Sequence, residues 1–194
     1  VNNNESMFEK IIGFIFKDRL KNHLKKLQRQ RRFVNYNNAQ SIFLLFESDF
    51  AEKNVEVRRI IQKLTADGKK VTAWGYTDKK LTSTPILPDF KILNKKDFDF
   101  SQKPNESILS ELAENKFDLL IDLTEKEIIP LQYIALYAIA DFKTGIKRNH
   151  SKIYDFMMDM DGISNQSEES LVEINATFIY NQIIFYLKSI QTSD

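Results

Sequence analysis

The sequence predicts an α/β protein, a Rossmann-like three-layer sandwich with a mostly parallel sheet, preceded by a basic amphipathic helix. Short apolar runs alternate with amphipathic segments along most of the chain, and basic residues gather near its start. The chain has 194 residues, of which 42% are hydrophobic and 28% charged. This length and composition suit one well-buried core and exclude a disordered protein.

The first 38 residues differ in charge from the rest of the chain. They carry nine Lys and Arg side chains against three acidic ones, a net charge of +6, whereas the remainder has a net charge of −5. Residues 7–33 also have helical periodicity. The apolar positions of that helix are Phe16, Leu20, Leu24 and Leu27. An asparagine cluster comes next, so we divide the chain into a basic helical arm at 7–34 and a single Rossmann-like domain at 39–194.

The domain opens with the pattern of a βαβ unit. The unbroken apolar run Ser41–Phe46 is typical of a strand buried on both faces. A helix follows, for which Asn54 is the expected N-cap and Gly68 the expected left-handed C-cap. Lys70–Tyr76 then reads as a second strand. Strand, capped helix and strand within this length predict a right-handed parallel crossover.

Strands and helices continue to alternate to the end of the chain. The expected elements are a short strand at 90–93, a helix at 105–115, a buried strand at 117–123, an apolar helix from Pro130 to about Ala140, short strands at 142–146 and 153–160, and a closing amphipathic helix at 168–190.

The composition excludes several kinds of chemistry. The chain has no cysteine, so disulfides, thiolate metal sites and thiol nucleophiles are ruled out, and it has only two histidines. It has five glycines, against about fourteen at average usage. The first strand runs into Glu47-Ser48-Asp49, where a dinucleotide-binding loop would place glycines. We therefore predict no bound cofactor and no metal centre.

Carboxylates follow several of the expected strands. In parallel sheets ligands collect at the carboxyl ends of the strands, which makes Glu47, Asp49, Asp78 and Asp122 weak catalytic candidates. Together they could hold Mg²⁺, since this ion prefers oxygen ligands. The alternative function is thus a small magnesium-dependent enzyme acting on a phosphorylated or nucleotide-linked substrate. The plainer interpretation, which we favour, is that these residues lie in solvated loops.

The helical arm is the stronger candidate for a contact element. Its basic face carries Lys17, Lys21, Lys25, Arg29 and Arg32. This face suits RNA, or an anionic membrane surface into which neighbouring apolar residues insert. The inserting residues would be Phe8, Ile11, Ile12, Phe14, Ile15 and Phe16. In a third interpretation the helix packs on the domain or on a second copy of the chain in a homo-oligomer.

The favoured function is therefore a non-catalytic binding or adaptor protein that contacts an anionic partner through this helix. The apolar stretch at 11–16 is far shorter than the roughly 20 residues that cross a bilayer. We expect a cytoplasmic location, peripheral to the inner membrane if the helix binds lipid.

Two stretches resemble known proteins. Residues 117–123, 130–145 and 154–159 resemble a small bacterial family known only as a domain of unknown function, a resemblance that covers most of the chain from about Ser41. The segment FDLLIDL, with the later IALYAIADFKTGIK, is similar to the amino-terminal domain of heptosyltransferases. That similarity implies a Rossmann-like fold. It transfers no catalytic residue, because the glycine-rich loop and the nucleotide-sugar-binding half have no counterpart in this sequence.

Overall fold

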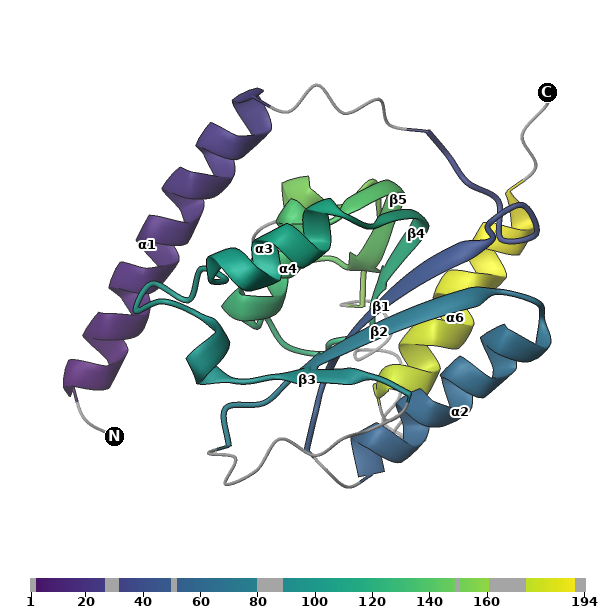
Figure 1. The fold of residues 1–194 in the computed structure, drawn as a ribbon, viewed down its shortest axis with the longest axis horizontal. Helices are drawn as coiled ribbons and strands as arrows, with labels where there is room; N and C mark the ends of the chain where they lie inside the picture. Colours follow the sequence, from purple (N-terminus) through teal and green to yellow (C-terminus); the bar gives the residue numbers. More distant parts are fainter. Residues whose placement is uncertain are drawn as a thin grey trace.

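The computed structural model describes residues 3–26, 32–49, 52–79, 89–148, 151–160 and 174–190. Six parallel strands form one sheet in the order β3-β2-β1-β4-β5-β6 (Figure 1). The strands are β1 (Ser41–Glu47), β2 (Lys70–Tyr76), β3 (Lys91–Leu93), β4 (Lys116–Asp122), β5 (Ile139–Ile146) and β6 (Phe156–Met158). The predicted parallel α/β fold is confirmed. From β1 the next strands, β2 and β3, are added on one side of the sheet, and from β4 the next strands, β5 and β6, are added on the other side. The boundary between β1 and β4 is the switch point at which doubly wound sheets form their ligand-binding crevice.

Helices cover both faces of the sheet and complete the three layers. They are α1 (Asn3–Lys26), α2 (Glu52–Ala66), α3 (Glu106–Ala113), α4 (Ile129–Tyr137) and α6 (Ala176–Ser189). Helices α2 and α6 pack on one face, while α3 and α4 cover the other, with α1 lying outermost against α4 (Figure 1).

The central strand β1 is buried on both faces. Ile42, Leu44 and Phe46 belong to the core beneath α2 and α6, and Phe43 and Leu45 belong to the core beneath α3 and α4. All five side chains are at most 1% exposed. Alternate residues of a strand point to opposite faces, so an unbroken apolar run is what a strand between two helical layers requires.

The predicted βαβ unit is confirmed. Strands β1 and β2 pair in register from Ser41 opposite Lys70 to Glu47 opposite Tyr76. Gly68 has a φ of +78°, the left-handed conformation expected after a helix. The predicted N-cap is wrong, because α2 already begins at Glu52. Asn54 lies inside the helix, where its side-chain oxygen accepts a 2.8 Å hydrogen bond from the Ser48 hydroxyl.

Several other boundaries differ from the sequence prediction. Helix α4 ends at Tyr137, because Ile139 already pairs with Lys116 of β4. Helix α6 begins later than expected, since Asn175 is its N-cap and accepts a hydrogen bond from the Phe178 amide. Of the strand predicted at 153–160, only β6 forms. Residues 168–173 of the predicted closing helix lie outside the described residues, as do 27–31 of the predicted arm.

Helix α1 packs along its inner face on the same core as α3 and α4. Phe16 is fully buried, and its ring meets the Tyr133 ring edge-on with centroids 4.7 Å apart. The Arg19 guanidinium donates to the Ser101 hydroxyl at 2.6 Å and to the Tyr133 hydroxyl at 3.3 Å. The inner face of the arm therefore contacts the domain, as the third interpretation expected.

Gly75 allows β2 to lie close to its neighbours. A Cβ atom at this position would lie 2.7 Å from two atoms of the Phe46 ring and 2.8 Å from Cδ1 of Ile92. Because both neighbours are buried, we expect Gly75→Ala to lower the free energy of unfolding by about 1–3 kcal/mol, as measured by urea denaturation. Gly13→Ala is the control, since a Cβ there meets nothing within 4 Å. Equal effects of the two changes would contradict this account.

Candidate functional site

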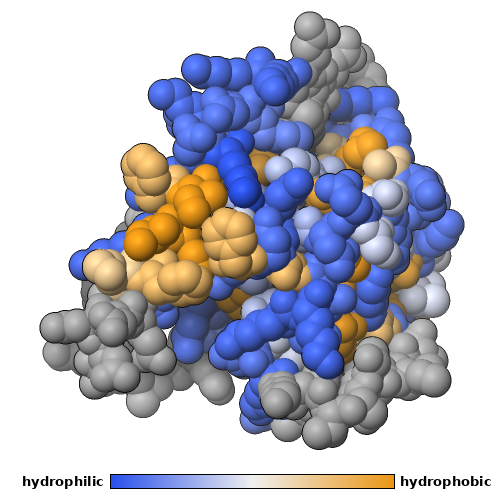
Figure 2. Space-filling model, turned by 60° about the vertical axis from the view of Figure 1, so that its left-hand side comes forward, coloured by the Kyte–Doolittle hydropathy of each residue, from blue (hydrophilic) through white to orange (hydrophobic). Residues whose placement is uncertain are grey.

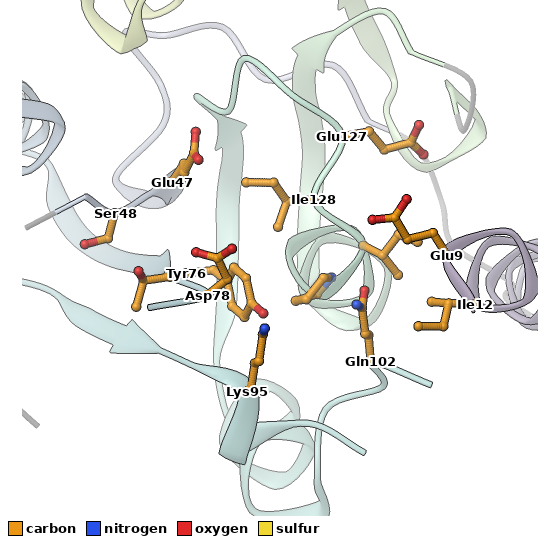
Figure 3. A pocket seen from close by; sticks show the side chains of 13 residues that line it. Glu9, Ile12, Glu47, Ser48, Tyr76, Asp78, Lys95, Gln102, Glu127 and Ile128 are labelled. Atoms are coloured by element: carbon orange, nitrogen blue, oxygen red, sulfur yellow. The ribbon is translucent and has the colours of Figure 1, made fainter. Parts of the chain in front are cut away.

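A cleft of about 500 Å³ opens between α1 and the carboxyl end of the sheet (Figure 3). It lies beyond the ends of β1 and β2, beside the start of α4. Its lining consists of Glu9, Ile12, Glu47, Ser48, Tyr76, Thr77, Asp78, Lys95, Gln102, Glu127, Ile128, Ile129 and Pro130. A second, more apolar hollow continues it past Phe8, Phe98 and Phe100. The cleft thus occupies the edge of the sheet where ligands of this fold class bind.

Of the four predicted carboxylates, Glu47 and Asp78 meet at this cleft. Glu47 is neutralised by Lys53, whose ammonium lies 2.5 Å from its carboxylate and 3.6 Å from that of Glu125. Burial lowers the pKa of Lys53, but the hydrogen bond to Glu47 and the nearby negative charges outweigh this and raise it. A carboxylate held by a charged lysine is a poor general base. Asp78 is exposed at the end of β2.

The other two carboxylates do not line the cleft. Asp49 precedes α2, and its carboxylate accepts a 3.4 Å hydrogen bond from the Lys53 amide. A carboxylate at this place stabilises the helix N-terminus. Asp49 is thus a helix-terminal residue that does not line the cleft.

Asp122 is fully buried in a hydrogen-bonded network at the end of β4. Its Oδ1 accepts from the amide (2.9 Å) and the hydroxyl (2.6 Å) of Thr124. Its Oδ2 accepts from Arg148 at 3.1 Å, from the Tyr154 hydroxyl at 2.5 Å and from Gln132 at 3.4 Å. Burial and the charge of Asp122 raise the pKa of Tyr154 well above its usual value. Both oxygens are engaged within the protein, so Asp122 serves the structure of this edge.

No magnesium site emerges from the predicted carboxylates. Among the residues that the structure describes, no three acidic or histidine side chains gather closely enough to hold a metal ion.

The outward side of α1 carries an apolar patch, defined as Met7, Phe8, Ile11 and Phe14, in which Phe8 lies at the edge and also borders the apolar hollow beside the cleft. These side chains are between 49% and 74% exposed. Figure 2 shows this apolar surface over the N-terminal half of α1, next to a hydrophilic surface over its C-terminal half. Ile12 and Phe16, which the sequence placed in the same inserting set, are instead buried against the domain.

The predicted basic residues divide between α1 and the segment after it. Lys17, Lys21 and Lys25 form an exposed row with helical spacing, called here the lysine row. Arg32 is exposed beyond the helix, and Arg29 lies outside the described residues. No helix in the described part of the chain is long and apolar enough to cross a membrane.

Sequence reasoning missed most of the cleft. Tyr76 could have been found, since it ends a predicted strand at the ligand-binding edge. Glu9 could not, because it reaches the cleft only when α1 folds back onto the domain. Gln102 lies in a loop with a φ of 62°, and no periodic signal marks it.

Fold and site together define a doubly wound α/β protein with a cleft at the carboxyl end of its sheet and no glycine-rich phosphate loop. The chain belongs to the family described as "Family of unknown function (DUF6913)", whose model matches residues 13–172. The comparisons found no match among curated proteins or solved structures.

The Asp122 network gives a stability prediction. We expect Asp122→Asn to lower the free energy of unfolding by about 3–5 kcal/mol, because the change leaves the buried Arg148 guanidinium without its counter-charge. Asp89→Asn is the matched control, since Asp89 also pairs with an arginine, Arg58, at 2.8 Å but near the surface. That change should cost less than about 1 kcal/mol. Urea denaturation with and without Mg²⁺ measures both, and a loss that appears only with Mg²⁺ would contradict the structural role.

Proposed function

We propose that the protein is a non-catalytic adaptor that attaches to an anionic membrane surface through the outward side of α1. The observation that carries this proposal is the joint presence on that side of the apolar patch and the lysine row. The proposal places the protein in the cytoplasm, peripheral to the inner membrane.

The apolar patch provides the insertion energy. Large apolar side chains scattered singly over a surface are ordinary, but several in one contiguous patch mark an interaction site. Phe14 is 74% exposed, and Met7 and Ile11 share its side of the helix. Burying one such side chain stabilises a complex by about 1.5–3 kcal/mol. An interfacial helix inserts its apolar side chains to the boundary between headgroups and acyl chains.

The lysine row provides the electrostatic attraction. Lys17, Lys21 and Lys25 recur every fourth residue and therefore project in nearly the same direction from α1. Each basic side chain near an anionic bilayer contributes about 1 kcal/mol of attraction. Anionic lipid headgroups would pair with the lysine row, and acyl chains would contact the apolar patch.

Neither of the other partners fits both halves equally well. RNA would pair with the lysines through its phosphates, but duplex or backbone contacts offer little to Met7 and Ile11. A second copy of the chain would present apolar side chains to the patch and further lysines to the lysine row. An anionic lipid surface is the partner whose chemistry complements both.

Vesicle cosedimentation tests the proposal. We expect the full chain to bind vesicles that contain phosphatidylserine and to be released by salt. Replacing all three residues of the lysine row by glutamine should weaken binding on the order of 100-fold, since about 3 kcal/mol of attraction is lost. Phe14→Ser should weaken it by at least about tenfold.

Controls come from the helices on the opposite face of the sheet. Phe185→Ser changes another exposed phenylalanine, on α6, and Arg59, Lys63 and Lys188 replaced by glutamine match the lysine substitutions on α2 and α6. These variants should bind as the original chain does. Absence of vesicle binding overturns the proposal. An RNA gel shift that disappears when the lysine row is replaced would identify RNA as the partner instead. A dimer in light scattering that disappears in Phe14→Ser would identify a second copy of the chain.

A further inference from the structure

The cleft behind α1 is separate from the outward side of that helix and has the features of a small-molecule site. Its volume of about 500 Å³ lies within the range of ligand pockets. Its walls come from α1, from the ends of β1 and β2, from the loop after β3 and from the start of α4 (Figure 3). Convergence of distant segments on one hollow is typical of a built site.

Tyr76 presents a polar group to the cleft. The residue is only 7% exposed, and its hydroxyl makes no hydrogen bond to any residue that the structure describes. Figure 3 shows the hydroxyl end of the ring directed into the cleft. The hydroxyl oxygen is accessible from the cleft, where a bound ligand can form a hydrogen bond with it. Burial and the charge of Asp78 raise the pKa of Tyr76 to about 12, so the group is a neutral donor and acceptor.

The charge of the lining is negative. Among the described lining residues Lys95 is the one basic side chain, against carboxylates on several walls. Glu47 is already paired with Lys53. Glu9 on α1 and Asp78 after β2 form no ion pair within the described residues, and Figure 3 shows them on different sides of the cleft. The unpaired negative charge is therefore spread along the hollow.

This distribution favours an organic cation over a metal ion or a phosphate. The described carboxylates form no cluster of three that could hold a metal, and a phosphate would be repelled by Asp78 and Glu9. Between the carboxylates lie the apolar side chains of Ile12, Ile128 and Pro130. A flexible chain with amines at intervals would place its charged ammonium groups beside the carboxylates and its methylene groups against the apolar side chains.

We propose that this cleft binds a linear aliphatic polyamine, with its ammonium groups beside Asp78 and Glu9 and one of them donating to the Tyr76 hydroxyl. The proposal is independent of membrane attachment, because its residues lie on the inner side of α1 and the sheet edge. The positive charge of Lys95 repels the ammonium groups of the ligand, so replacing Lys95 with a neutral residue should strengthen binding.

Calorimetric titration of the full chain with spermidine tests this site. We expect binding of spermidine and none of inorganic phosphate. Asp78→Asn should weaken spermidine binding about tenfold, and Tyr76→Phe should weaken it less, since only one hydrogen bond is lost. Lys95→Gln should tighten it by a similar factor. Asp89→Asn, at an exposed aspartate outside the cleft, should leave it unchanged.

The opposed signs separate a binding site from damage to the fold, because loss of structure would weaken binding in every variant. Urea denaturation of Asp78→Asn and Lys95→Gln checks that both remain folded. Failure of spermidine to bind, or binding that Asp78→Asn and Lys95→Gln leave unchanged, overturns the proposal. Phosphate binding lost in Lys95→Gln would also overturn it and assign the cleft to anions.

Discussion

Burial of β1 on both faces determines the arrangement of every other layer. Five consecutive large side chains cannot be covered from one side, so helices must pack on both faces of the sheet. Helices α2 and α6 cover one face, and α3 and α4 cover the other. With both faces closed, the carboxyl end of the sheet is the place left for a hollow. The N-terminal half of α1, which packs beside α4, completes the wall of that hollow with Glu9 and Ile12.

The sequence predicted the fold well because its signals are local. The apolar run of β1 and the conformation of Gly68 each depend on a few neighbouring residues, and both appear as expected. The role of Asp122 could not be predicted in that way. Its partners Arg148 and Tyr154 lie 26 and 32 residues further along the chain, and no periodicity connects them. A strand-end carboxylate looks the same in the sequence whether it faces solvent or a buried arginine.

The same limit applies to α1, whose two sides have different environments. Helical periodicity separates Phe16 and Leu20 from the lysine row, as observed. It does not reveal that the apolar residues of the N-terminal half divide between the core and the surface, because the apolar residues at 11–16 point to more than one side of the helix. Only contact with Tyr133 and its neighbours decides which residues remain exposed. Tertiary packing thus divides the apolar residues of this segment into a buried set and an exposed set.

The lengths of the outer strands bear on how this protein avoids aggregation. A sheet edge presents unpaired amide and carbonyl groups that can recruit a strand from another molecule. In the described residues β3 and β6, which end the sheet, are three residues each, whereas the inner strands have seven or eight. A foreign strand would find few backbone partners at either side. The short outer strands of the described sheet therefore lower the risk of edge-to-edge polymerisation.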